Sequence, residues 1–244
     1  MLKWYNSKQG EKMNYLDTHF IELDKKWLAI RNKKNIEEIE SATNKKLDGE
    51  FYLGYSYIDH FSGRSIALIG AVRKNNKIYE PTFKPEELKS NISKIDDVYM
   101  KESSLEVDIL KSKEINKMLK GAIETYIKDC FYTPLHKSMK KIRKYKNLDK
   151  HRAYHNPDNI NIMLEKEDVW CSIVGENKNK IHAILINTPT KNDKIKRDDL
   201  LILEYNKEID KYIAIENFHP IEKGKEEIKY NIYGNIKSYI YEGE

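Results

Sequence analysis

The sequence TPLHKSMKKIRKYKNLDKHRAYHNPD, residues 133–158, lies between a half of the chain with helical spacing and a half rich in strand-forming residues. Residues 137–152 contain eight Lys and Arg side chains and a single Asp, a net charge of +7. The whole chain carries +5, so the rest of it sums to −2. The positive charge is therefore local, and a local basic surface is the electrostatic signature of a phosphate-binding face.

The beginning of this stretch predicts a helix. Thr133 can cap the helix with its hydroxyl, and Pro134 suits the first helical position because the amide hydrogen it lacks would be unpaired there. Leu135, Met139 and Ile142 then recur at helical spacing and form a narrow apolar stripe. We expect this helix to end near residue 147, with its lysines on the remaining surface.

The same stretch supplies the candidate nucleic-acid contacts. Lysine and arginine side chains would contact phosphates, and tyrosines beside them would stack on unpaired bases. The candidates are Lys137, Lys140, Lys141, Arg143, Lys144, Tyr145, Lys146, Lys150, Arg152 and Tyr154. Two alternatives stand beside this interpretation: a basic helix also suits an acidic protein partner, and the Lys, Ile, Asn and Tyr excess is typical of an AT-rich bacterial or mobile-element genome.

The residues before this stretch predict a small α/β part that ends in a helix. A broad apolar stripe over residues 112–131 predicts the most regular helix, which would form a central helical pair with the basic one. Residues 50–73 predict a hairpin with a turn at Ser62-Gly63, and residues 78–79 a further strand. A helix is expected from Asn35 to about Thr43. Residues 15–31 favour a helix, with two short strands as the alternative.

The residues after it predict a mostly antiparallel sheet. Strand-like patterns occupy residues 160–164, 169–174, 181–187, 200–205, 212–216 and 228–233. The expected fold class is α+β, with a small N-terminal α/β part, the helical pair and the C-terminal sheet. The expected parts are residues 1–150 and 151–244, which could also form one continuous domain.

Composition places the chain among soluble proteins. Of its 244 residues 34% are charged and 39% hydrophobic, and the apolar ones are patterned. Its two cysteines, Cys130 and Cys171, both fall in apolar patterns, which favours buried thiols over a disulfide. The N-terminal residues lack an apolar signal-peptide core, and no apolar run is long enough to span a bilayer. We therefore expect a cytoplasmic protein with no membrane partner.

Two constellations could carry chemistry. Pro157-Asp158 followed by Glu176-Asn177-Lys178 resembles the motif of the PD-(D/E)xK nuclease superfamily. The resemblance implies that Asp158 and Glu176 hold Mg²⁺, which activates water, and that Lys178 stabilises charge. The residues around Lys178 nevertheless have the pattern of a turn, whereas the family places this part of the motif on a strand.

The second constellation is a pair of histidines. His151 and His155 lie beside cations and could act as the base and the acid of a metal-independent ribonuclease. The alternative is that both are surface histidines in a basic loop.

The sequence thus predicts a nucleic-acid-binding protein, with RNA or single strands favoured and no cofactor required. One alternative is a non-catalytic inhibitor or immunity-type protein that docks on an acidic partner. The other alternative is an endonuclease that uses Mg²⁺ at the first constellation or histidines at the second.

Overall fold

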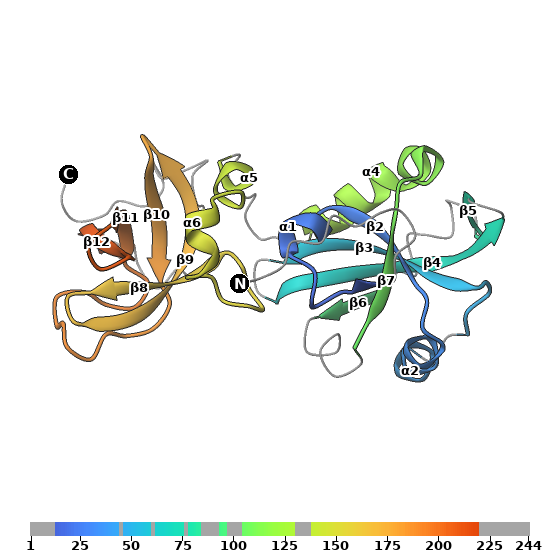
Figure 1. Ribbon diagram of the computed structural model, residues 1–244, viewed down its shortest axis with the longest axis horizontal. Coiled ribbons are helices and arrows are strands. Elements are labelled where there is room, and N and C mark those ends of the chain that lie inside the picture. Colours follow the sequence, from blue (N-terminus) through green and yellow to red (C-terminus); the bar gives the residue numbers. More distant parts are fainter. Residues whose placement is uncertain are drawn as a thin grey trace, which may run out of the picture. The chain divides into compact units, whose positions relative to one another are not determined.

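A computed structural model shows a strand-rich chain of mixed α and β structure (Figure 1). It describes residues 13–43, 46–59, 62–75, 78–83, 93–96, 104–129 and 138–219. The chain divides into two compact units, Met1–Cys130 and Phe131–Glu244. The sequence instead predicts either a division between residues 150 and 151 or one continuous domain.

The first unit is built on a seven-stranded antiparallel sheet. Its strands are β1 (Met13–Asn14), β2 (Lys26–Ile30), β3 (Phe51–Asp59), β4 (Gly63–Asn75), β5 (Ile78–Pro81), β6 (Ser93–Asp96) and β7 (Glu106–Leu110). They lie in the order β1-β7-β2-β3-β4-β5, and β6 pairs with another part of β4. The predicted hairpin over residues 50–73 is confirmed as β3 and β4. Strand β7 has no counterpart in the sequence prediction, and it inserts between β1 and β2.

Within its described residues, three helices accompany this sheet: α1 (Phe20–Leu23), α2 (Lys33–Thr43) and α4 (Lys113–Asp129). Helix α4 confirms the strongest helix prediction, and its residues Ile115, Leu119 and Ile123 are at most 1% exposed. Helix α2 is also confirmed, but Asn32 rather than Asn35 caps it, since the Asn32 side chain accepts the Lys34 amide. The amide oxygen of the buried Asn35 instead accepts the backbone amide of β7 at Glu106.

The single helix favoured over residues 15–31 is wrong. The chain forms the one-turn helix α1, turns at Lys25 with φ 60°, and continues as β2. The physical reason is burial, because Trp27 to Ile30 are all buried between neighbouring strands β3 and β7. A strand buried on both faces has a continuous apolar run, which periodicity alone does not distinguish from a helix.

The second unit is a closed five-stranded barrel. Its strands are β8 (Asn159–Leu164), β9 (Glu167–Asn177), β10 (Lys180–Leu185), β11 (Leu200–Asn206) and β12 (Lys211–Phe218). Consecutive strands pair antiparallel, and β12 pairs parallel with β8. The parallel pair follows from the odd number of strands, because the first and fifth strands of an antiparallel series run the same way. The mostly antiparallel prediction is confirmed, and the sheet closes on itself.

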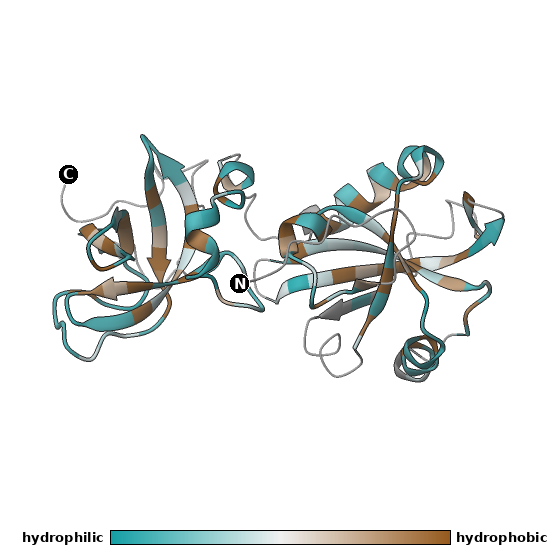
Figure 2. Ribbon diagram, viewed as in Figure 1, coloured by the Kyte–Doolittle hydropathy of each residue, from teal (hydrophilic) through white to brown (hydrophobic). Residues whose placement is uncertain are grey.

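The barrel is filled by alternate side chains of its strands. In β8, Ile160, Ile162 and Leu164 are buried, whereas the residues between them are partly exposed. Figure 2 shows hydrophobic residues along the strands and hydrophilic residues in the connecting turns. Cys171 belongs to this core as an unpaired buried thiol, as predicted, and Cys130 lies outside the described residues.

The long basic helix expected from Thr133 to residue 147 is wrong over its described part. Residues 138–149 form two single turns, α5 (Met139–Ile142) and α6 (Lys146–Asp149), with Tyr145 in an extended conformation between them. This break brings Leu148 into the barrel core together with Met139 and Ile142. Thr133, Pro134 and Leu135 lie outside the described residues, as does the strand expected over residues 228–233. No helix in the described part of the chain is long and apolar enough to cross a membrane.

Candidate functional site

The basic segment, which we define as residues 138–158, is held against the barrel by apolar side chains. Met139, Ile142 and Leu148 are 2% exposed or less and pack with the strand residues of the core. The cationic residues between them therefore point either inward, toward the barrel, or outward, toward solvent. The two arginines point inward and the lysines point outward.

Arg143 lies inside the unit, in an ion pair with Asp158. Its Nε lies 3.0 Å from Asp158 Oδ1 and its Nη2 lies 2.6 Å from Oδ2, and the two side chains are 4% and 9% exposed. This two-pronged geometry matches the planar guanidinium to both carboxylate oxygens. Arg143 therefore joins α5 to the start of β8, and it is not positioned to contact a ligand.

The Arg152 side chain is also buried, and its hydrogen bonds connect different parts of the same unit. It donates to Asp149 Oδ1 at 3.2 Å, to the Ile142 carbonyl at 2.8 Å and to the Pro157 carbonyl. Its side chain is 3% exposed. The guanidinium thus connects α5, α6 and the loop before β8, so two of the predicted phosphate contacts serve the fold.

Lys141 and Tyr145 share the carboxylate of Glu176 on β9. The Lys141 ammonium lies 2.6 Å from Glu176 Oε1, and the Tyr145 hydroxyl lies 2.5 Å from Oε2. The hydrogen bond to Glu176 raises the pKa of Lys141 to about 12. Burial would raise the pKa of Glu176, but the hydrogen bonds from Lys141 and Tyr145 outweigh it and lower that pKa. The carboxylate therefore stays charged and neutralises one lysine of the segment.

Lys150 has a similar partner on the turn between β11 and β12. Its ammonium pairs with Asp210, which also accepts the Tyr205 hydroxyl. The hydrogen bond to Asp210 raises the pKa of Lys150. Both carboxylates are far along the chain, 35 residues from Lys141 and 60 from Lys150. Sequence reasoning missed Asp210 and Tyr205 because no local pattern links them to the segment.

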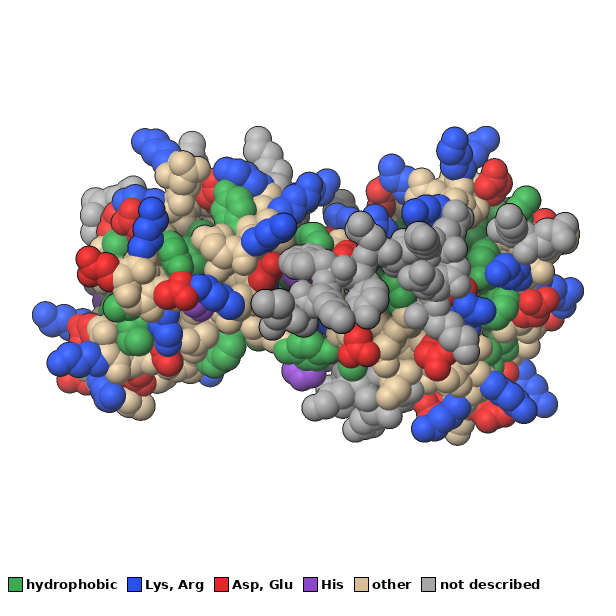
Figure 3. Space-filling model, viewed as in Figure 1, with side chains coloured by type: hydrophobic (Ala, Val, Ile, Leu, Met, Phe, Trp, Pro, Cys, Tyr) green, Lys and Arg blue, Asp and Glu red, His purple; other side chains and the backbone are tan. Residues whose placement is uncertain are grey.

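The surface of the segment retains lysines at Lys140, Lys144 and Lys146. Neither Lys140 nor Lys144 forms an ion pair with any acidic side chain that the structure describes. Tyr154 is 56% exposed, and its ring lies edge-on to the exposed His155 at 5.2 Å between centroids. In Figure 3, Lys and Arg side chains gather on the barrel unit around α5. Lys137 lies outside the described residues.

The residues of the nuclease-like motif have separate partners. Asp158 is held by Arg143, and Glu176 by Lys141 and Tyr145, while Lys178 lies in the turn between β9 and β10 with φ 47°. The turn expected around Lys178 is therefore confirmed. Within the described residues, no group of three or more His, Cys, Asp or Glu side chains could hold a metal ion. The arrangement thus gives a Mg²⁺ site no positive support.

The two histidines differ in environment. His151 is 9% exposed, and its ring meets Tyr212 edge-on at 5.9 Å. Burial and the neighbouring Lys150 lower the pKa of its imidazole. His155 is exposed beside Tyr154. The two rings thus lie in different environments, one buried and one exposed, and this gives a shared acid–base site no positive support.

Comparison of the chain with protein-family models, with curated proteins and with solved structures finds no match. The function is therefore argued from the segment's own chemistry.

Proposed function

We propose that the protein binds nucleic acid, with RNA and other single strands favoured, through the surface of the basic segment. The observation that carries the proposal is that three lysines of the basic segment are exposed, whereas the side chains of both its arginines are buried. Lys140, Lys144 and Lys146 supply the phosphate contacts, and the half-exposed ring of Tyr154 supplies a face on which an unpaired base stacks.

Lys141 and Lys150 extend this surface. Their side chains are 58% and 47% exposed although each has a carboxylate partner. The Asp210 side chain that pairs with Lys150 is itself 58% exposed, and exposed ion pairs contribute little to stability, so a phosphate can replace Asp210 beside Lys150 with little loss of stability. The Glu176 side chain is only 7% exposed, so Lys141 keeps its ion pair and its ammonium contributes to the surface beside that pair. The proposal includes a cytoplasmic location, which suits the unpaired thiol of Cys171. It requires no cofactor.

The test is a titration of labelled single-stranded RNA, single-stranded DNA and duplex DNA, followed by fluorescence anisotropy across a salt series. The variant Lys140→Gln/Lys144→Gln/Lys146→Gln removes three charges without touching the arginines. Losing three contacts should weaken binding and reduce the slope of log affinity against log salt by about 2 for single strands. Tyr154→Ala should weaken binding more than Tyr154→Phe, which keeps the ring.

The matched control is Lys166→Gln/Lys194→Gln/Lys196→Gln, which removes three exposed lysines of the same unit outside the segment. It should keep the affinity and salt slope of the unchanged protein. Equal loss in both triple variants would show that only net charge matters and would overturn the proposal. So would absence of binding to all three nucleic acids, which would favour the acidic protein partner. Cleavage of a strand in Mg²⁺ would favour the endonuclease instead.

A further inference from the structure

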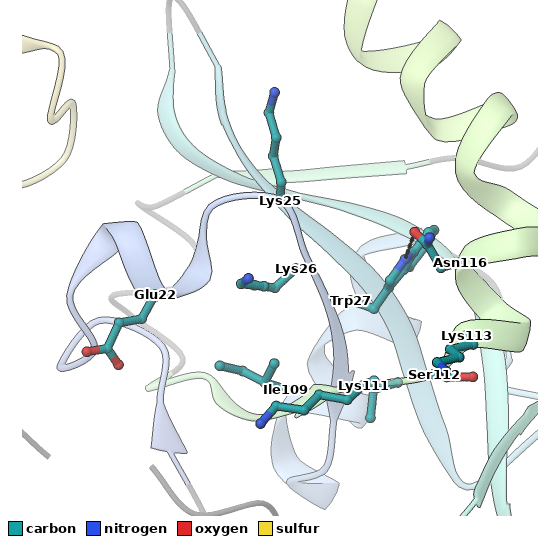
Figure 4. A pocket seen from close by; sticks show the side chains of 10 residues that line it. Glu22, Lys25, Lys26, Trp27, Ile109, Lys111, Ser112, Lys113 and Asn116 are labelled. Atoms are coloured by element: carbon teal, nitrogen blue, oxygen red, sulfur yellow. Dashed lines mark hydrogen bonds between the residues drawn. The ribbon is translucent and has the colours of Figure 1, made fainter. Parts of the chain in front are cut away.

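The first unit contains a cavity of about 750 Å³ that the sequence prediction did not anticipate. It lies where β2 begins and β7 ends, close to the first turn of α4 (Figure 4). Four lysines line it, at positions 25, 26, 111 and 113, and Glu22 is the one acidic residue among its lining residues. A concave surface with charge of one sign concentrates counter-ions, so this cavity favours an anion.

Two of these lysines lie at the end of the β2–β7 ladder. Lys26 is the first residue of β2, and Lys111 follows the last residue of β7, one position beyond the terminal Trp27–Leu110 pair. Figure 4 shows both side chains extending to the same side, on either side of Ile109. Like charges that lie close together repel each other. An anion bound between Lys26 and Lys111 would remove that repulsion.

The lysines of the cavity also differ from others in the unit. Lys33, Lys34 and Lys120 each have a glutamate four residues along their helix within ion-pairing distance. None of the four cavity lysines forms an ion pair with an acidic side chain in the described residues of the chain. Among the described residues, no carboxylate neutralises these four charges through an ion pair.

The wall of the cavity includes the buried Trp27, which is held by contacts on the α4 side of the sheet. Trp27 is 5% exposed, donates its Nε1 hydrogen to Asn116 Oδ1 at 3.3 Å, and meets the Tyr55 ring edge-on at 4.7 Å. Ser112 caps α4 by accepting the Ile115 amide at 3.2 Å. The 17-residue helix α4 thus begins at the cavity, where its dipole adds partial positive charge. An apolar side chain, Ile109, thus lies beside the two lysines that extend to the same side, Lys26 and Lys111, and apolar groups beside a few polar ones are the usual composition of a small-molecule site.

We propose that this cavity binds a nucleoside phosphate, with the phosphate between Lys26 and Lys111 and the nucleoside against Ile109, on the same side of β2 and β7. Several separated cations match a group with several anionic oxygens better than a single carboxylate. The volume lies within the roughly 300–1,000 Å³ range of small-molecule sites. The site lies in a different unit from the basic segment, and neither proposal depends on the other.

Isothermal titration calorimetry of the full chain with AMP, ADP, pyrophosphate and adenosine tests the proposal. We expect AMP and ADP to bind, pyrophosphate to bind more weakly because it lacks the nucleoside, and adenosine not to bind. Lys26→Gln/Lys111→Gln should lower the AMP affinity at least tenfold, and Lys26→Arg/Lys111→Arg should largely restore it. Lys33→Gln/Lys34→Gln, with the same charge change on α2, should leave the affinity unchanged.

Thermal unfolding provides an independent check. Because Lys26→Gln/Lys111→Gln removes a repulsion, its Tm without ligand should equal or exceed that of the unchanged protein, and AMP should raise the Tm of the unchanged protein alone. A lower Tm in the variant would show that the lysines serve the fold. That result, or equal binding of adenosine and AMP, or absence of AMP and ADP binding, would overturn the proposal. Lys140→Gln/Lys144→Gln/Lys146→Gln should bind AMP normally, which separates a failure here from a failure of nucleic-acid binding.

Discussion

At the scale of single residues, the basic segment separates arginine from lysine. Arg143 and Arg152 are buried with carboxylate and carbonyl partners, whereas Lys140, Lys144 and Lys146 lie at the surface. The guanidinium carries several donors in a planar fork, so it can satisfy fixed acceptors inside a protein, whereas an ammonium is more strongly hydrated. A count of charges along the chain cannot reveal this division, because Asp158 is a partner only after β8 has joined the barrel.

The Arg143–Asp158 pair makes the first prediction. Arg143→Ala leaves the Asp158 carboxylate buried without its cation, which should lower the free energy of unfolding by about 3–5 kcal/mol. Replacing both partners by Met and Leu should lower it much less, since no charge is then left unpaired. Urea denaturation measures the free energy of unfolding of both variants and of a control, Lys144→Ala. The control should differ from the unchanged protein by no more than about 0.5 kcal/mol. An Arg143→Ala protein as stable as this control would contradict the structural role of the pair.

His151 makes a prediction about pH. Burial holds the pKa of its imidazole below the ordinary 6.5, and burial does the same for His182. The unfolded chain therefore binds more protons than the folded one below 6.5, so stability is fully present above that value and declines as pH falls toward the folded pKa. The free energy of unfolding should be lower at about pH 5.5 than at about pH 7.5. His151→Phe should reduce this difference between the two pH values. An unchanged difference would contradict the role of His151 in the pH dependence. The control is His155→Phe, at an exposed position.

At the scale of elements, the sequence predicted those whose signal is local. Helix α4 has an unbroken apolar stripe, and the β3–β4 hairpin has its turn residues in place, so both were found. Strand β7 and the break at Tyr145 were missed because each depends on a partner distant in the chain. β7 is stabilised by β1 and β2, and the break exists so that Leu148 can enter the barrel. The same reason limits the candidate site: its exposed lysines were foreseen, but the acids that pair with their neighbours were not.

The helical turns α5 and α6 pack on the barrel and contribute side chains to its core, and this leads to a prediction. Leu148 is fully buried in that core. Leu148→Ala should lower the free energy of unfolding by about 2–5 kcal/mol through lost burial and the cavity left behind. The exposed Lys140→Ala should change it by no more than about 0.5 kcal/mol. Equal effects in chemical denaturation would mean that the helical turns do not contribute to the core.

At the scale of the whole molecule, the two units each have a hydrophobic core. The first is centred on residues such as Leu28, Ile30 and Ile66, and the second on alternate residues of the barrel strands. A unit with its own core is expected to fold alone. A boundary between residues 150 and 151 would divide the second core, because Met139, Ile142 and Leu148 belong to that core. The sequence predicts this boundary because the basic segment has the pattern of a helix that pairs with the preceding one. Only its contacts with the barrel assign it to the second unit.

The last prediction compares the two boundaries directly. Residues 131–244 should fold alone and unfold cooperatively in denaturant, because this fragment retains Met139, Ile142 and Leu148 in the core and Arg143 beside Asp158. Residues 151–244 contain every barrel strand but lose all four side chains, so this fragment should show no cooperative transition. Circular dichroism during urea titration distinguishes the two. If the shorter fragment unfolds as cooperatively as the longer one, the side chains of residues 138–150 are not part of the barrel's core. The barrel would then fold without the segment that carries the exposed lysines.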